Sequence, residues 1–415
     1  MADLGIFQLA HQGPPGSVSP FAEFGYLENP FPPSGLSGPL YTAHMPSALE
    51  RINQWLATVQ SATARGEQVP PLALRGALGV GKTHLLQTIE SGLSRYAKFP
   101  VLRRNLTDMG MTKLLLANLL LGALPNLRQT AGLLIPIAAP SAVPLLDEIA
   151  EQGRKEGRSR RQEVLSVLDS ASSLRMPLER VFEADVMTEA DLRRWFALWL
   201  TRGTTTPRQR NKLGLSAPLE GEGQAISAIA DLMRVARKLG LLQAWFVLID
   251  QFEEVWRPHV LTEGRAARFL TDTRTLIDSA FLGAPIAVLL AWNTKATAAD
   301  AAGGEDELAE RYRALWQRLG SPIDLPGLRL QDLWPFAMHY LENVSPSRVI
   351  PQAEAKRRVF ADLLQRKGWL PVGKLLDGNS FNAMLGPEQF AQRSVLQAWR
   401  EVAAQLARER PTGDE

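Results

Sequence analysis

A glycine-rich run that ends in lysine and threonine is the part of this sequence best suited to chemistry. Residues 76–83 read Gly-Ala-Leu-Gly-Val-Gly-Lys-Thr, which fits G-x-x-x-x-G-K-[ST] without a mismatch. Glycines let such a loop curl so that its N–H groups point inward at phosphate oxygens. We expect Lys82 to reach the β- and γ-phosphates of a nucleotide and the Thr83 hydroxyl to ligate Mg²⁺. The expected nucleotide-binding residues here are Gly76, Gly79, Val80, Gly81, Lys82, Thr83 and His84.

A hydrophobic run that closes in a carboxylate is the second chemical signal. Residues 246–250 read Phe-Val-Leu-Ile-Asp, and Asp250 is expected to hold Mg²⁺ through water. Hydrolysis also needs a group that polarises the attacking water, and the next residue, Gln251, is not an acid. Glu253 is the favoured catalytic base and Glu254 the second choice. The alternative is that both are solvated acids at the start of a helix.

Another apolar run, residues 288–293, ends in a polar residue, Asn293. In ATPases with an extra strand between the phosphate-loop strand and the acidic strand, a polar residue at this place senses the γ-phosphate. Asn293 is therefore the candidate sensor, and a simple turn residue is the alternative. Residues 293–296 read Asn-Thr-Lys-Ala rather than the N-K-x-D that guanine recognition requires, so we expect ATP and not GTP.

Parallel strands must position these side chains. The amphipathic run 83–96 predicts a helix directly after the phosphate loop, and Ser47 is the expected N-cap of an earlier helix. Residues 106–240 are mostly helical in pattern, and so is the chain from Gln331 onward. Short apolar strands are expected at residues 70–74, 100–105, 245–249, 284–291 and 321–325. The order predicts an α/β fold with a three-layer parallel sheet.

Composition excludes several classes of protein. The chain has 415 residues, of which 45% are hydrophobic and 21% charged, as in an ordinary globular protein. It contains no cysteine, which excludes disulfides, zinc fingers, iron–sulfur clusters and a thiol nucleophile. Residues 1–26 lack a basic segment followed by an apolar core, so we expect no signal peptide and a cytoplasmic location. The apolar stretches 114–124 and 131–146 are too short or too interrupted by proline to span a membrane.

The order of these motifs resembles the AAA+ and STAND families of P-loop ATPases. Residues 248–256, Leu-Ile-Asp-Gln-Phe-Glu-Glu-Val-Trp, are similar to the acidic strand of bacterial STAND-like proteins. Residues 213–240 are similar to a segment of ATP-binding proteins from BREX-type phage-defence systems, and the C-terminal helices to the lid of initiator-type AAA+ ATPases. The resemblance covers roughly residues 40–105 and 240–400. It implies an ASCE/AAA+-like P-loop NTPase fold, ATP hydrolysis with Mg²⁺, and assembly into homo-oligomers.

The resemblance also implies a division of the chain. The separation between Lys82 and Asp250 is far longer than in the usual core of either family, so a large helical insertion is expected between the second and third strands. The expected parts are an irregular arm at 1–43, an ATPase core at 44–330 holding the insertion at 106–240, a helical lid at 331–407 and a polar tail at 408–415.

Further site residues follow from the same resemblance. The helix predicted at 307–319 stands where AAA+ proteins place an arginine finger, with Arg318 as first choice and Arg313 as second. Arg393, at the start of the last helix, is similar to a lid sensor arginine, although all three arginines could instead be solvated. Tyr41 is the candidate to stack on adenine, and packing in a core is its alternative.

Two basic runs, residues 154–161 and 202–212, are expected as loops that contact DNA phosphates, with an ordinary solvated surface as the alternative. The expected function is an ATP-hydrolysing, AAA+/STAND-like oligomeric switch acting on or beside DNA, in bacterial genome defence or mobile-element biology. The second hypothesis is a nucleotide-gated adaptor that recruits a protein effector encoded elsewhere with little hydrolysis. The missing acid directly after Asp250 favours it.

Overall fold

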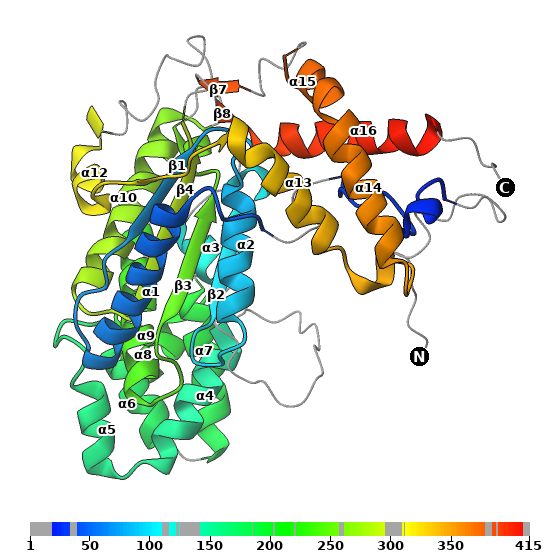
Figure 1. Ribbon diagram of the computed structural model, residues 1–415. Coiled ribbons are helices and arrows are strands. Elements are labelled where there is room, and N and C mark those ends of the chain that lie inside the picture. The colour runs from blue at the N-terminus through cyan, green and yellow to red at the C-terminus, as the bar shows by residue number, and fades with distance from the viewer. Residues whose placement is uncertain are drawn as a thin grey trace. The chain divides into compact units, whose positions relative to one another are not determined.

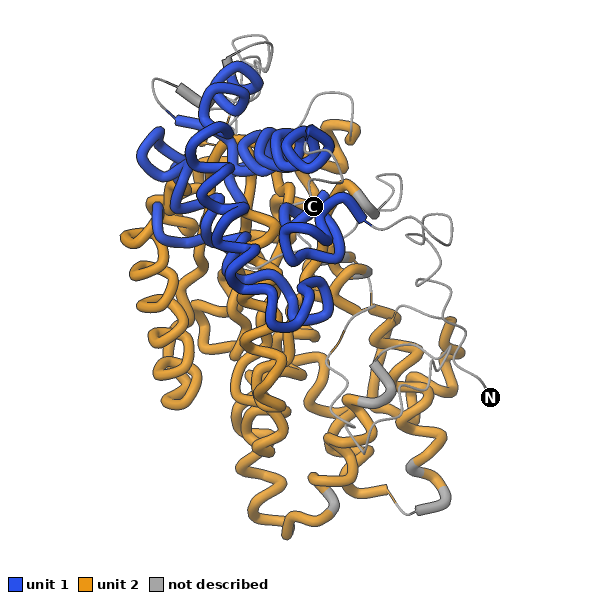
Figure 2. Tube along the Cα trace, turned by 45° about the vertical axis from the view of Figure 1, so that its right-hand side comes forward, with its two compact units in different colours: residues 1–44, 79–81, 326–415 blue, residues 45–78, 82–325 orange. Residues whose placement is uncertain are grey.

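The chain forms two compact units (Figure 2). The computed structural model describes residues 19–33, 40–109, 116–121, 124, 142–184, 186–201, 204–219, 221–256, 261–294, 309–310, 312–377, 384–386 and 389–409. One unit, here the sheet unit, comprises residues 45–78 and 82–325. The other, here the C-terminal unit, comprises residues 1–44, 79–81 and 326–415, so the middle of the glycine-rich loop groups with it.

A five-stranded parallel sheet forms the centre of the sheet unit. Its strand order is β2-β3-β4-β1-β5, and all four neighbouring pairs are parallel. The strands are β1 (Leu72–Gly76), β2 (Val101–Asn105), β3 (Trp245–Asp250), β4 (Ile286–Asn293) and β5 (Ile323–Asp324). The five predicted strands are confirmed, and the chain is an α/β protein. Strand β4 lies between β1 and β3, where the sequence predicts an extra strand.

Helices cover both faces of this sheet (Figure 1). Every residue of β3 is buried, as expected for a parallel strand that is covered on both sides. Trp245, Val247 and Ile249 pack into the hydrophobic cluster that holds α3, α9 and α10. Phe246 points to the opposite face, where its ring meets Trp55 of α1. Because side chains alternate along a strand, Asp250 lies on the same face as Phe246.

The helices of the sheet unit include a long series between β2 and β3. They are α1 (Pro46–Arg65), α2 (Lys82–Leu93), η3 (Leu106–Met109), α3 (Leu116–Leu121), α4 (Ala142–Lys155), α5 (Arg158–Leu165), α6 (Arg175–Glu183), α7 (Val186–Leu200), α8 (Pro207–Lys212), α9 (Glu222–Lys238), η5 (Phe252–Val255), α10 (Glu263–Phe281) and α12 (Arg313–Leu319). From η3 to α9 the described residues between β2 and β3 are mostly helical, as predicted.

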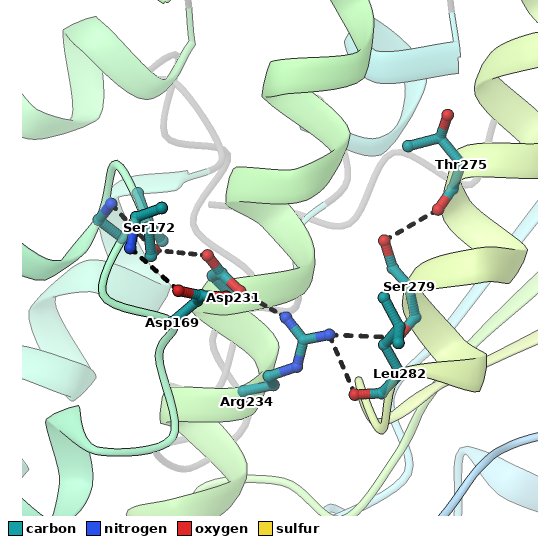
Figure 3. Close-up of polar contacts among 9 residues, drawn as sticks. Asp169, Ser172, Asp231, Arg234, Thr275, Ser279 and Leu282 are labelled. Atoms are coloured by element: carbon teal, nitrogen blue, oxygen red, sulfur yellow. Dashed lines mark hydrogen bonds and ion pairs between the residues drawn. The ribbon is translucent and has the colours of Figure 1, made fainter.

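Arg234 ties this helical series to a helix that covers the sheet (Figure 3). Its guanidinium binds the Asp231 carboxylate and donates to the carbonyl oxygens of Ser279 and Leu282, each at 3.3 Å. Asp231 also accepts a hydrogen bond from the Ser172 hydroxyl, which lies between α5 and α6. One side-chain network therefore connects the 165–175 connection, α9 and the end of α10.

The C-terminal unit is built around aromatic side chains. The Phe24 and Phe360 rings lie 4.4 Å apart between centroids, and Phe31 stacks on Trp399. Its helices are η1 (Ala22–Phe24), η7 (Leu330–Asp332), α13 (Leu333–Glu342), η8 (Pro346–Arg348), α14 (Glu354–Lys367), α15 (Trp369–Asp377) and α16 (Gln392–Glu409). Strands β6 (Leu328–Arg329), β8 (Gln389–Phe390) and β7 (Met384–Gly386) form a small antiparallel sheet in that order. The prediction of helix alone beyond Gln331 is therefore wrong.

Two local predictions also need correction. Helix α1 begins at Pro46, so Ser47 lies inside its first turn and is not the N-cap; the N-cap residue is Met45, without a side-chain cap. Proline suits the first helical position because its missing N–H has no partner there in any case. The basic runs are not loops either. Residues 154–161 lie mostly in α4 and α5, and Pro207–Lys212 form α8.

Some predicted segments lie outside the described residues. These are residues 1–18 and 34–39 of the arm, 131–141 of the second apolar stretch, 202–203 of the second basic run, 307–308 and 311 of the predicted finger helix, and 410–415 of the tail. Within the described ranges, no helix has the length and apolar character needed to cross a membrane.

Candidate functional site

The predicted site residues of the sheet unit gather where its strands end. Gly76, Asp250 and Asn293 are the last residues of β1, β3 and β4, and the carboxyl ends of parallel strands share one edge of the sheet. Gly76 is the register partner of Asn293, and the Thr294 N–H donates to the Gly76 carbonyl at 3.0 Å. The strand order therefore brings together residues that are far apart in the sequence.

The glycine-rich loop after β1 has the backbone that its glycines predict. Gly79 and Gly81 have φ angles of 81° and 100°, which side chains disfavour. The carbonyl of Gly79 accepts from the Arg393 N–H at 3.2 Å, and that of Val80 accepts from the Gln392 side chain at 3.0 Å. A Cβ at Gly81 would lie 3.3 Å from the Gln392 amide oxygen. Glycine at this position therefore serves both the turn and the close approach of α16.

Lys82 begins helix α2 with a buried side chain. Its ammonium donates to the carbonyl oxygens of Gly76 at 2.6 Å and Ala77 at 2.7 Å. Burial lowers the pKa of Lys82 to about 8, while the nearby carboxylates of Glu253 and Asp250 oppose this shift. The ammonium and the two carboxylates therefore lie close enough to interact. A site for a phosphate and its metal ion needs such a neighbouring pair of charges, one positive for the phosphate and one negative for the metal ion.

Asp250 leaves one carboxylate oxygen without a partner. The side chain is buried, and its Oδ1 accepts from the Gln251 N–H at 2.9 Å. Its Oδ2 is also buried, yet it finds no hydrogen-bond partner among the described residues. A buried carboxylate oxygen is costly to leave unpaired, so this atom fits a site for Mg²⁺ or its bound water.

Thr83, the other expected oxygen ligand, is a half-buried residue that follows Lys82 in the first turn of α2. Within the described ranges, no group of three or more His, Asp or Glu side chains is placed to hold a metal ion. Mg²⁺ needs no such cage, since it commonly takes one or two protein oxygens together with phosphate oxygens and water. Asp250 and Thr83 are a donor set of this kind.

Glu253 and Asn293 form a pair. One Glu253 carboxylate oxygen accepts from the Asn293 side-chain amide, and the other accepts from the Asn293 N–H at 3.1 Å. Burial raises the pKa of Glu253, and the two donors of Asn293 together with the Lys82 charge act against this rise. Glu254 is buried in the same short helix, η5. Of the two acids, Glu253 is the one that meets the candidate sensor.

Tyr41 and His84 are packed against their neighbours. Tyr41 is buried in the aromatic cluster of the C-terminal unit, where its ring stacks on His44 at 5.5 Å and meets the edge of Phe336. This is the packing role that the sequence left open for it. His84 is buried in α2, and its carbonyl accepts from the Thr88 hydroxyl.

The three candidate arginines differ in their surroundings. Arg318 forms an ion pair with Asp278 and donates to the Ala314 carbonyl at 2.8 Å. Arg313 is exposed and has no ion-pair partner within the described ranges. Arg393 is also exposed, and its backbone N–H binds the glycine-rich loop. Arg313 is therefore better placed than Arg318, the first choice from the sequence, to reach another chain.

Several residues of the basic runs already have structural partners. Arg161 donates to the carbonyls of Gly153, Glu156 and Phe182. Arg210 donates to the Thr205 carbonyl, and the Lys212 ammonium lies 5.2 Å from the centre of the Trp195 ring. These contacts stabilise helix packing, so contact with DNA stays a prediction for the remaining basic side chains.

Sequence reasoning missed three residues that contact the site. Gln251, passed over because it is not an acid, binds Asp250 through its N–H and Thr107 through its side chain. Gln392 binds the loop and His44. The position of Gln251 directly after a strand-ending acid is a signal that could have been used, whereas nothing in the sequence points to Thr107.

A comparison with models of known protein families finds no match, and neither does a comparison with curated proteins.

Proposed function

We propose that this chain binds ATP with Mg²⁺ at residues 76–83 and hydrolyses it slowly, as a conformational switch. One observation carries the proposal: the Lys82 ammonium, the unpartnered Asp250 oxygen and the Glu253–Asn293 pair meet at the carboxyl edge of one parallel sheet. A triphosphate needs a cation for its oxygens, an oxygen ligand for its metal ion and a base for the attacking water. The edge offers each of these.

Each residue has one role in this proposal. Lys82 exchanges its two carbonyl partners for phosphate oxygens, and Thr83 and Asp250 hold the metal ion. Bound Mg²⁺ neutralises charge on the phosphates. Glu253 orients water and accepts its proton, and Asn293 senses the terminal phosphate. This assignment amounts to a P-loop fold of the AAA+/STAND type, which the motif order and the position of β4 between β1 and β3 support.

Restrained hydrolysis is part of the proposal because Glu253 is already occupied. Each of its carboxylate oxygens accepts a hydrogen bond from Asn293, so an attacking water has to share these oxygens with the two Asn293 donors. This favours a chain whose turnover waits for a partner, and it keeps the adaptor hypothesis as the second candidate. A partner protein and a role in genome defence remain proposals that rest on the sequence resemblance.

Substitution of Lys82 tests the proposal. Lys82→Met is expected to abolish binding of Mg²⁺·ATP in a protein that still folds, because methionine keeps the length of the apolar stem and lacks the ammonium; thermal stability should fall modestly, since the Gly76 and Ala77 carbonyls lose their donor. Lys98→Met is the matched control, since this lysine is exposed in the same unit and, among the described residues, the hydrogen bonds that involve it are made by its carbonyl. Nucleotide titration and thermal melting are measured on both variants. ATP binding that survives Lys82→Met would overturn the assignment.

The same titrations separate the two acids. Glu253→Gln is expected to keep ATP bound and to lose turnover, because the amide preserves shape and removes the basic charge. Glu254→Gln is expected to retain turnover if the protein stays folded. The reverse pattern would exchange the two roles, and turnover that persists in both variants would mean that neither acid is the catalytic base.

A further inference from the structure

Gln251 has a backbone conformation that its residue type disfavours. Its φ and ψ are 56° and 42°, in the left-handed region. Within the described ranges, Gln352 is the other non-glycine residue with positive φ. Such conformations cost free energy and persist where the surroundings hold them. Gln251 stands between Asp250 and Glu253, so its conformation sets the direction in which the chain leaves β3.

Three polar groups of Gln251 make hydrogen bonds, namely its N–H, its carbonyl and its side-chain oxygen. Its N–H donates to Asp250 Oδ1 at 2.9 Å, and its carbonyl accepts from the Glu254 N–H at 3.0 Å. Its side-chain oxygen accepts from the Thr107 hydroxyl. Thr107 lies in η3, directly after β2, and its own N–H donates to the Asn105 side chain at 3.1 Å. The Gln251 side chain thus ties the end of β2 to the end of β3.

These contacts form one polar chain along the edge of the sheet. It runs from Thr107 to Gln251, through the backbone of η5 to Glu253, and from Glu253 to Asn293 at the end of β4. The turn at Gln251 places η5 and, with it, the Glu253 carboxylate on Asn293.

We propose that Gln251 is a positioning residue, whose contact with Thr107 holds Glu253 on Asn293 and thereby restrains hydrolysis. The inference deepens the proposed function and rests on it. It also gives the helical series between β2 and β3 a route to the site, because that series begins in the turn that contains Thr107. In this proposal a displacement of η3 acts on Glu253 through the contact between Thr107 and Gln251.

The test removes one hydroxyl. Thr107→Val keeps the shape of the side chain and loses the donor, and Thr107→Ser restores a donor. Loss of a neutral hydrogen bond of ordinary strength changes an equilibrium by about 2- to 10-fold. We therefore expect kcat for ATP to rise about 2- to 10-fold in Thr107→Val, with KM little changed, and to return towards the parent value in Thr107→Ser.

A second readout needs no nucleotide. The Asn293 N–H donates to the Glu253 carboxylate, so its hydrogen exchange reports whether Glu253 stays in place. Exchange at Asn293 is expected to be faster in Thr107→Val than in the parent and in Thr107→Ser. Unchanged exchange would overturn the inference, whether or not ATP is hydrolysed.

Substitution of the glutamine provides the cross-check. Gln251→Gly adopts positive φ without strain but lacks the side chain, so it should reproduce Thr107→Val, and the double variant should add nothing further. Gln352→Gly is the matched control, because it relieves the same kind of backbone strain in the C-terminal unit and should leave turnover unchanged. A kcat that falls or stays constant in Thr107→Val, while Mg²⁺·ATP still binds, contradicts the restraint alone. If the parent protein does not bind ATP, the proposed function itself is contradicted.

Discussion

The Lys82 ammonium is buried and is held by neutral groups of the backbone. Two carbonyl groups solvate the ammonium, and no carboxylate forms an ion pair with it within the described ranges. With a pKa of about 8, the side chain is mostly protonated at neutral pH even though it is buried. Exchange of neutral carbonyls for phosphate oxygens keeps its hydrogen bonds and adds charge, which strengthens them. The buried ammonium could therefore bind an anion without losing hydrogen bonds.

The protonation of Glu253 leads to a prediction about pH. A general base works when it is ionised, so turnover should fall as pH decreases through the pKa of Glu253. Burial raises this pKa, which puts the acid limb of the rate profile above the ordinary glutamate range. Asn293→Ala removes a donor that lowers the pKa and should move the acid limb to still higher pH. The measurement is kcat against pH, between about pH 5 and 9.

Asn343→Ala is a suitable control for that profile. Asn343 ends α13 in the C-terminal unit, where its side chain donates to the His339 carbonyl at 2.8 Å. Its replacement should leave the acid limb where it is. An acid limb that keeps its position in an Asn293→Ala variant that still binds ATP would contradict the link between Asn293 and the charge of Glu253.

At the scale of elements, the strands were the predictable part. The unbroken apolar run at 245–249 predicts a buried parallel strand, and β3 places Asp250 at its end as expected. The glycine pattern likewise predicts a left-handed backbone at Gly79 and Gly81. Each of these features depends on neighbours along the chain, so one sequence is enough to recognise it.

Contacts between elements were less accessible to prediction. The pairing of Glu253 with Asn293 requires that β3 and β4 be neighbours, and the contact of Gln251 with Thr107 requires the same of β2 and β3. The basic run 154–161 was expected as a loop because its charge hides the helical pattern. Arg161 shows why charge alone misleads, since its guanidinium binds carbonyl groups of the fold.

The network around Arg234 leads to a prediction about stability. Arg234→Met keeps the apolar stem but removes the donor to one Asp231 carboxylate oxygen and to two carbonyls. The Arg234 and Asp231 side chains are only 16% and 14% exposed. We expect the free energy of unfolding to fall by about 1–3 kcal/mol, as for a lost hydrogen bond to a charged group. The measurement is urea unfolding followed by circular dichroism.

Arg160→Met is the matched control for that experiment. Arg160 also pairs with an acid three residues away, Glu163, but its side chain is 42% exposed. Exposed ion pairs contribute little to folding, so no measurable loss is expected. Equal effects of the two substitutions would show that the Arg234 network does not hold α9 to α10.

At the scale of the whole molecule, the glycine-rich loop has residues in both compact units. Residues 79–81 group with residues 1–44 and 326–415, whereas Lys82 groups with the sheet. Gln392 holds the loop through the Val80 carbonyl and reaches His44 at 2.9 Å. Gly81 is bonded directly to Lys82, so the chain passes from the C-terminal unit to the sheet unit within this loop.

Assembly of several chains provides the last prediction. An arginine supplied by a neighbouring chain is worth about 10³–10⁵ in the rate of phosphoryl transfer. Arg313 is exposed and has no ion-pair partner among the described residues, whereas Arg318 is engaged by Asp278. We expect turnover per chain to rise with protein concentration, and Arg313→Ala to remove this rise without weakening ATP binding. The measurement is a dilution series of ATPase rate, with light scattering to follow mass.

Arg318→Ala separates the two arginines within this experiment. It leaves Asp278 without one of its two cations, so it should lower the melting temperature and keep the dependence on concentration. Mixing Arg313→Ala chains with Lys82→Met chains should restore some turnover, because at a shared interface one chain supplies the arginine and the other an intact phosphate loop. A constant rate per chain and a monomeric mass across the series would contradict the prediction of assembly. The protein would then act as a single chain, and the contact between Glu253 and Asn293 alone would restrain hydrolysis.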